Sequence, residues 1–156
     1  DADALDPFLR AARSGRNAAT LLTPNDGEFR RLFPSAPEAE AERLRFVAGA
    51  LRDAGLGILA KGATDLLIGP EGTRVNRHHH PAGSVSGAGD LLSGVSAFLL
   101  GSRLTALEAA RLASYWVGEA GLRAFAHRSH GLVATDMLDE LPAALAAGLQ
   151  ATSPAA

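Results

Sequence analysis

The fold is decided by residues 58–72, which read ILAKGATDLLIGPEG. Two apolar runs, ILA and DLLIG, stand on either side of the letters KGAT, and EGTRVN follows the second run through another turn. Short apolar runs bounded by glycine, proline and aspartate are typical of buried strands. The stretch therefore predicts three short strands in succession.

Upstream of these strands, residues 38–54 show the periodicity of a helix. Apolar side chains recur there at spacings of three and four residues, at Leu44, Val47, Ala48 and Leu51, and Gly55 favours an end to the helix. Before this helix, residues 18–23 (AATLLT) form an apolar run that reaches Pro24, and proline disfavours helical backbone in the residue before it. Strand, helix and strand in this order predict a βαβ unit in an α/β fold whose sheet is covered on both faces.

The downstream part of the chain is predicted to be helical. Residues 90–100 form one apolar helix, Thr105 caps a second, and Thr135 caps a third that Pro142 interrupts. Residues 1–150 are then expected to belong to one domain, and residues 151–156 (ATSPAA) to form a disordered tail.

Composition and charge exclude several classes of protein. The chain has 156 residues, of which 47% are hydrophobic and 21% are charged, the profile of one globular domain. A net charge of −2 offers no basic field for nucleic acid or an anionic membrane, and no apolar run approaches the roughly 18 residues of a membrane-spanning helix. The absence of cysteine excludes disulfides and thiolate metal sites and is typical of a reducing cytosol, so we expect a cytoplasmic protein.

Residues 87–90, GAGD, are the strongest chemical motif. Glycines before a helix let the backbone approach a ligand closely, and the first amides of a helix lack internal partners and lie at its positive end. Gly87, Ala88 and Gly89 therefore predict an anion site suited to a phosphoryl group. Asp90 beside it could act as the general base that takes a proton from an attacking hydroxyl, or it could simply cap the helix, and these four residues leave both interpretations open.

Two further strand ends carry polar residues, at the edge where ligands of open α/β sheets collect. Lys61 could meet a phosphate while Gly62 allows a nucleotide to approach, although a solvated lysine in a turn explains the same letters. After the first strand, Asn25, Asp26 and Glu28 could bind a substrate or a metal-bound water. Alternatively, Asp26 caps a short helix and Glu28 lies in its first turn.

The run of three histidines, His78, His79 and His80, raises the question of a metal site. Adjacent side chains on a strand point to opposite faces, so three in a row do not converge readily on one ion. Without cysteine or an evident carboxylate partner, we expect a solvated loop and no metal site.

Several of these stretches occur together, in order, in one known family. They are DADAL (residues 1–5), LTPNDGEFRRL (22–32), ILAKGATDLLIGPEG (58–72), SGAGDLLSG (86–94) and GLVATDMLDELPAAL (131–145). The set resembles the carboxyl-terminal part of the ADP-dependent NAD(P)H-hydrate dehydratases, which belong to the ribokinase-like superfamily. The resemblance implies a three-layer α/β/α sandwich and a lyase that repairs hydrated NADH or NADPH. In that reaction ADP or ATP, with Mg²⁺, phosphorylates the hydroxyl on the damaged ring, and phosphate then leaves.

The resemblance also implies roles for individual residues. Asp90 matches the catalytic aspartate, which contacts the hydrate as well, and Gly89 matches a nucleotide-contacting glycine. Gly87 and Gly89, with Ala88 between them, would supply the backbone of the anion hole. The loop that holds ADP corresponds to Lys61, Gly62, Ala63, Thr64 and Asp65.

Three departures from the family pattern concern the site. The family usually has TPHPGE, with the histidine contacting the hydrate, and here Asn25 and Asp26 replace the His-Pro pair. Asn25 can still form hydrogen bonds with the substrate, but it carries no charge at any pH. The usual GTGD is GAGD, so a hydroxyl is lost at Ala88, and Val117 stands where a helix of the family usually carries a histidine.

The start of the chain is expected to lie inside a longer domain. It begins DADALDPFL, without methionine or a basic signal-peptide region, and we interpret it as a cut chain whose partner is the missing amino-terminal part. Ribokinase-like dehydratases are often oligomeric, so the resemblance also implies a homo-oligomer.

Two other functions stay open. One is a ribokinase-like kinase of hydroxymethylpyrimidine or a sugar, because GAGD is common among those enzymes, although DADAL and ATDML favour the dehydratase. The other is a catalytically impaired nucleotide-binding module, which the substitutions at Asn25, Asp26 and Val117 would explain.

Overall fold

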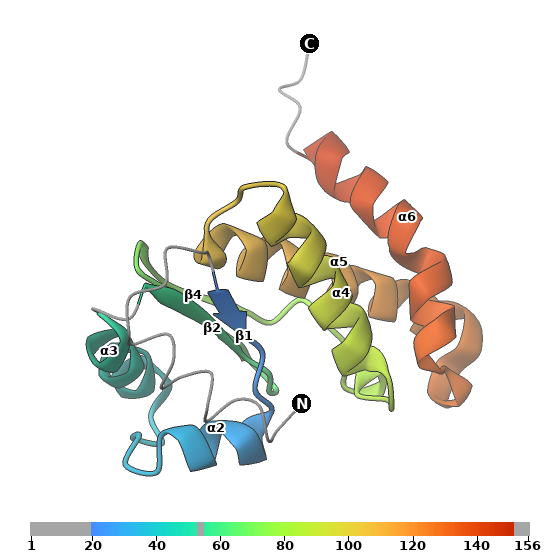
Figure 1. The fold of residues 1–156 in the computed structure, drawn as a ribbon. Helices are drawn as coiled ribbons and strands as arrows, with labels where there is room; N and C mark the ends of the chain where they lie inside the picture. The colour runs from blue at the N-terminus through green and yellow to red at the C-terminus, as the bar shows by residue number, and fades with distance from the viewer. Residues whose placement is uncertain (1–19, 53–54, 152–156) are drawn as a thin grey trace.

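The computed structural model describes residues 20–52 and 55–151, with the backbone alone for residues 149–151. The strands are β1 (Thr20–Leu22), β2 (Leu56–Ala60), β3 (Asp65–Gly69) and β4 (Gly72–Asn76). The helices are α2 (Asp26–Leu32), α3 (Glu40–Leu51), α4 (Ala88–Gly101), α5 (Ala106–Arg128) and α6 (Ala134–Ala151), with short 3₁₀ turns at Pro81–Gly83 and Ser129–Gly131. Figure 1 shows their arrangement. Residues 152–156, most of the predicted tail, lie outside the described part.

The sheet has the order β1-β2-β3-β4. Strand β2 pairs parallel to β1 after the crossover through α2 and α3, and it pairs antiparallel to β3. Strands β3 and β4 form a tight hairpin in which Gly69 is opposite Gly72, and the positive φ of Gly72 (139°) suits the turn between them. The predicted βαβ unit and the three successive strands are confirmed.

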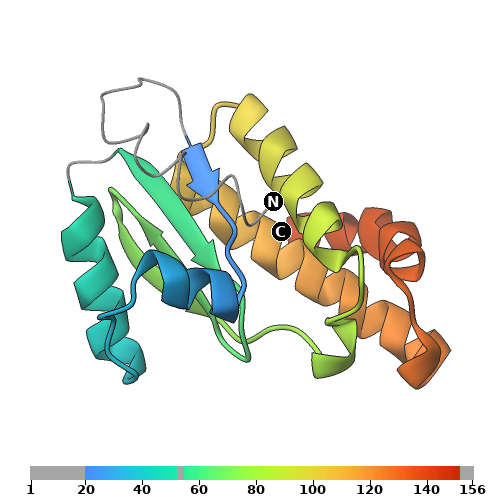
Figure 2. The same ribbon diagram turned by 60° about the horizontal axis from the view of Figure 1, so that its bottom comes forward.

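Both faces of the sheet are buried, as the apolar runs predicted. Along β2 and β3, Leu59 and Leu67 belong to a core shared with α4 and α5, whereas Ile58 and Ile68 belong to a core shared with α2 and α3. Successive side chains of a strand point to opposite faces, so a continuous apolar run fills both cores. Figure 2 shows α2 and α3 on one side of the sheet and the other helices beyond its opposite face, which gives the predicted α/β/α layers.

Helix α5 forms the layer in direct contact with the second face, and α4 and α6 pack against α5. Its buried side is rich in alanine: Ala109, Ala110, Ala113, Ala120 and Ala124 are at most 1% exposed. Small side chains let the backbones come close, and Gly57 of β2 and Gly69 of β3 lie directly beneath the start of α5. None of the described helices is long and apolar enough to span a membrane.

Three predicted helix starts need correction. Asn25, rather than Asp26, caps α2, and its side chain accepts from the Glu28 amide while the Glu28 carboxylate accepts from the Asn25 amide. Helix α4 begins at Ala88, two residues before the expected start. Thr135 does not cap α6 but lies inside it. Amino-acid preference alone could not choose between neighbouring residues that both favour caps.

Two other helix predictions can be compared with the structure. Thr105 caps α5 as expected, in a reciprocal arrangement with Glu108. Pro142 does not interrupt α6, which continues to Ala151. Proline removes one bond to the carbonyl four residues earlier, and Pro142 and Leu138 both lie on the exposed side of α6, where water can bind that carbonyl.

The closest backbone approach between α5 and the chain that leaves β4 gives a stability prediction. A Cβ atom on Gly118 would overlap the carbonyl oxygen of His78. We expect Gly118→Ala to lower the free energy of unfolding by about 1–3 kcal/mol, because the two backbones must separate. The matched control is Gly94→Ala in α4, where nothing lies within 4 Å of an added Cβ.

Gly94→Ala should raise the free energy of unfolding by about 0.5–1 kcal/mol, since alanine favours a helix over glycine. Urea unfolding of both variants measures the difference. Equal changes in the two variants would contradict the close approach.

Candidate functional site

A cavity of about 470 Å³ lies at the end of the sheet where β1 and β2 finish. The cavity is lined on one side by residues that follow these strands, Asn25 after β1 and Lys61 after β2. Segment 79–85 and the start of α4 form a second side, and the middle of α5 closes the third. The backbone amide of Lys61 donates to the carbonyl of Pro24 at 2.8 Å, which holds the two strand ends together.

One end of the cavity combines three features that favour an anion. Gly87 caps α4 with a positive φ of 89°, so the chain turns sharply into the helix. The amides of Gly87 and Gly89 donate to no acceptor among the described residues, whereas the Ala88 amide donates to the Val85 carbonyl. Lys61 Nζ lies 3.4 Å from where a Cβ on Gly89 would stand, and it has no ion pair within residues 20–52 and 55–151. Free amides, the helix dipole and an ammonium therefore favour negative charge at the same place.

The other end of the cavity is polar, and its carboxylate is hydrogen-bonded through both oxygens. Asp65 accepts from the Gly62 amide at 3.1 Å through Oδ1 and from the Ser114 hydroxyl at 2.7 Å through Oδ2. His79 Nδ1 lies 4.0 Å from the same Oδ2, with the His79 side chain 21% exposed. Asp65 is thus a shielded carboxylate held in one orientation.

Apolar and small residues line the wall between these ends. Val85, Leu92, Val117 and Met137 contribute side chains, and Gly118 and Gly121 present bare backbone. Val117 is 8% exposed and belongs to the core as well as to the cavity. The arrangement can accept a ligand that has an apolar, flat part and an anionic part.

The structure brings six of the predicted site residues to this cavity: Asn25, Lys61, Gly62, Asp65, Ala88 and Gly89. Gly87 adjoins it as the cap of α4. Two residues of the expected ADP loop, Ala63 and Thr64, do not line this cavity. Together with Lys61 and Gly62 they line a second cavity of about 430 Å³ on the α2 and α3 side of the sheet.

Asp90 lies in the first turn of α4 and is exposed, beside the cavity rather than among its lining residues. The interpretation of Asp90 as the helix cap is wrong, because Gly87 occupies the cap position and no side chain caps α4. The Asp90 carboxylate forms no hydrogen bond or ion pair with any described residue. It is free to act on a group held at the helix terminus, where the dipole also stabilises its charge.

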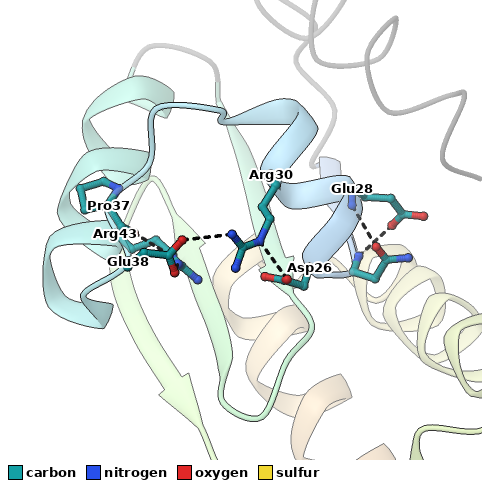
Figure 3. Close-up of polar contacts among 7 residues, drawn as sticks. Asp26, Glu28, Arg30, Pro37, Glu38 and Arg43 are labelled. Atoms are coloured by element: carbon teal, nitrogen blue, oxygen red, sulfur yellow. Dashed lines mark hydrogen bonds and ion pairs between the residues drawn. The ribbon is translucent and has the colours of Figure 1, made fainter.

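The residues after β1 act mainly in local structure. Asn25 uses its side-chain oxygen for the α2 cap, which leaves the Nδ2 donor free for a ligand. Asp26 accepts from Arg30 at 3.0 Å, and its hydrogen bond is the first cause of a raised pKa of the Arg30 guanidinium. Figure 3 shows this pair continuing through Glu38 to Arg43. The contacts of Asp26 and Glu28 are thus within and next to α2, and Asp26 also lines the second cavity.

The three histidines lie in a loop, as predicted, but their rings are packed against neighbouring groups and only partly exposed. His78 Nε2 lies 2.8 Å from Glu119 Oε2, and its ring stacks on Tyr115 with centroids 4.7 Å apart. His80 stacks on Phe125 at 3.8 Å. His79 and His80 line the cavity. The three rings point to different neighbours, and no group of three or more potential metal ligands occurs among the residues that the structure describes.

Several cavity residues escaped the sequence analysis. Ser114, Gly118 and Gly121 follow one face of α5 at spacings of four and three, and Met137 arrives from α6. Glycines inside a 23-residue helix were the available signal, because they mark places where another group comes close.

The structure is an α/β/α protein with a candidate anion site at the start of a helix. Hydroxyethylthiazole kinase from Pyrococcus horikoshii shares this fold, with a TM-score of 0.63, 22% identity, and 78% of this chain and 48% of the kinase covered. The family model described as NAD(P)H-hydrate dehydratase matches residues 1–143, and the chain belongs to this family.

Two relatives illustrate the match. The ADP-dependent (S)-NAD(P)H-hydrate dehydratase of Cenarchaeum symbiosum is 38% identical over 148 residues, which are 93% of this chain and 50% of that protein. A Bacillus subtilis ADP/ATP-dependent NAD(P)H-hydrate dehydratase, co-crystallised with ATP and Mg²⁺, is 25% identical with a TM-score of 0.73, over 85% of this chain and 49% of that structure. The chain thus spans about half the length of these relatives, and the α/β/α fold implied by the resemblance is confirmed.

A pH prediction follows from the contacts of Glu119 behind the cavity. Hydrogen bonds from His78 first, and then from Arg123, hold the pKa of the Glu119 carboxyl below its ordinary value of 4.5. A carboxyl with a lowered pKa stabilises the fold above pH 4.5 and loses that contribution as pH falls through its folded pKa. Glu119→Gln should therefore lower the melting temperature at pH 7, and the deficit should shrink below pH 4.5.

Melting curves of the two proteins from pH 7 to pH 3 measure the deficit. Asp139→Asn, an exposed change on α6, is the control and should leave the melting temperature unchanged at each pH. A deficit that stays constant from pH 7 to pH 3 would show that the charge of Glu119 is not its cause.

Proposed function

We propose that the protein to which this chain belongs restores hydrated NADH and NADPH, using ADP or ATP as the phosphoryl donor. The observation that carries the proposal is the uncommitted Asp90 carboxylate beside an anion site built from the Gly87 and Gly89 amides and the Lys61 ammonium. The relatives named as NAD(P)H-hydrate dehydratases support it. Because the chain spans about half of each, the activity of the whole protein is inferred rather than observed.

The nucleotide is placed in the cavity with its phosphates toward α4. The amides and Lys61 there offset the negative charge, and the apolar wall with Gly118 and Gly121 receives the base. The nucleotide enters as its Mg²⁺ complex, since Mg²⁺ keeps most of its waters and binds mainly through phosphates. A carboxylate is a suitable partner for such an ion or its waters, and Asp90 is the uncommitted carboxylate at this end of the cavity.

The hydrate is placed at the open rim, next to Asp90. The oxygen of the ring hydroxyl attacks the terminal phosphorus while the Asp90 carboxylate takes the hydroxyl proton. The bond from that phosphorus to the rest of the nucleotide breaks. The ring C–O bond then breaks with its electron pair leaving on phosphate, and the neighbouring ring carbon loses a proton, so that the ring double bond of NADH or NADPH forms again. Asn25 can donate its free Nδ2 hydrogens to the substrate, the role that a histidine would otherwise fill.

The setting of the reaction is also proposed. Hydrated cofactors arise where NADH and NADPH are used, so we infer a cytoplasmic enzyme whose ligands are nucleotides and dinucleotides. The net charge of −2 does not favour nucleic acid as a partner. We expect the missing half of the family domain to complete the substrate pocket, and a homo-oligomer to form as in other ribokinase-like dehydratases.

Nucleotide binding tests the anion site. We expect Lys61→Met to weaken Mg·ADP binding by about tenfold to a hundredfold, because a charge-assisted hydrogen bond to phosphate is lost. Arg45→Met removes one positive charge from exposed α3 and should change the affinity little. Isothermal titration at low and high salt measures the dissociation constant of each variant for Mg·ADP. Equal losses of affinity in the two variants would point to unspecific charge attraction.

Activity tests the role of Asp90. The longer parent protein, incubated with NADH hydrate, ADP and Mg²⁺, should regain the absorbance of NADH, and Asp90→Asn should lower the rate by about a hundredfold or more because the general base is gone. Asp139→Asn should retain the full rate, since Asp139 is exposed on α6.

The same assay separates the alternatives. No recovery of NADH, together with ATP-dependent phosphorylation of an added alcohol, would replace the dehydratase by a kinase. Binding of nucleotide with neither activity would leave a nucleotide-binding module.

A further inference from the structure

A chain of hydrogen bonds connects the two loops that border the cavity. The Gly62 amide donates to Asp65 Oδ1, and the Ser114 hydroxyl donates to Asp65 Oδ2 at 2.7 Å. Asn76 Nδ2 donates to the Ser114 hydroxyl oxygen at 2.6 Å, and Asn76 Oδ1 accepts from the His78 amide at 2.9 Å. The chain therefore runs from the loop after β2 to the segment after β4, through one side chain of α5.

The direction of each bond is dictated by chemistry. A carboxylate only accepts and an amide nitrogen only donates, so the single hydroxyl hydrogen of Ser114 must point to Asp65 while its lone pair faces Asn76. Ser114 is 3% exposed, so water does not replace either bond easily. Alanine at this position would leave Asp65 Oδ2 and Asn76 Nδ2, both partly buried, without this hydrogen bond.

The geometry of the sheet brings these groups together. Asp65 is the first residue of β3 and Asn76 the last of β4, and the two are opposite each other in the register. Both side chains reach α5 at Ser114, next to the cavity. Neither strand alone orients Asp65, because the hydroxyl that does so comes from a residue 49 positions away.

We propose that Ser114 is a positioning residue for the nucleotide. Through Asp65 it holds the Gly62 amide, and with it the strand end that carries Lys61, in the orientation that receives the phosphates. The placement of the ligand rests on the proposed function, whereas the coupling of Ser114 to Gly62 does not. Ser114 acts through Asp65 and is not itself assigned a contact with the reacting groups.

The first test is spectroscopic and needs no ligand. In the ¹⁵N-labelled chain, Ser114→Ala should move the Gly62 amide proton upfield, toward the position of a solvent-exposed amide, because Asp65 is released. Ser96→Ala is the matched control: Ser96 is also buried, at 4% exposed, but its hydroxyl has no hydrogen-bond partner among residues 20–52 and 55–151. It should leave Gly62 unchanged.

The second test measures Mg·ADP affinity by isothermal titration. Ser114→Ala should raise the dissociation constant about fivefold to tenfold, the effect of one lost hydrogen bond on a binding loop. Ser96→Ala should not change it, and Ser114→Thr, which keeps the hydroxyl, should restore most of the affinity. In an Asp65→Ala background, Ser114→Ala should add no further loss, since Ser114 acts through Asp65.

The outcomes are distinguishable. If the wild-type chain does not bind Mg·ADP but Gly62 moves in Ser114→Ala, the proposed function fails and the coupling stands. If Gly62 does not move, or if the Ser114→Ala loss persists undiminished in the Asp65→Ala background, the positioning role is overturned. A fall in melting temperature with unchanged Gly62 and unchanged affinity would reduce Ser114 to a stabilising residue. If Ser114→Thr fails to fold, the Asp65→Ala comparison decides.

Discussion

Burial of both faces of the sheet is the constraint on which the rest of the structure depends. Leu59 and Leu67 fill one core while Ile58 and Ile68 fill the other, so neither face of β2 or β3 can hold a polar ligand. Buried polar groups without partners are costly, and the polar chemistry therefore gathers where the strands end. The cavity lies there.

Helix α5 connects stability with the site. Its alanine-rich side is buried, and Gly118 lets it approach the chain at His78 closely. The same helix supplies Ser114 to the polar end of the cavity and Gly121 to its wall. The packing that stabilises the sheet thus also places the groups around the ligand, because both use adjacent turns of one helix.

The two ends of the cavity differ in how freely their groups can act. Asp65 is held by two donors, and its charge is used within the protein. Asp90, Lys61 and the Gly89 amide have no such partners among the described residues, so they are available to a ligand. A phosphoryl group held between an ammonium and free amides, next to an unused carboxylate, is the arrangement that phosphoryl transfer needs.

The sequence by itself determined the strands, most helices and the family. It could do so because periodicity, turns and helix ends depend on residues a few positions apart. Lys61 and Gly89 were found in this way. The tertiary structure alone decided which of them meet, which cavity Ala63 and Thr64 line, and what the histidines do. Those outcomes depend on contacts of residues far apart, such as His78 with Glu119 and Asp65 with Ser114, which form only when α5 lies across the sheet.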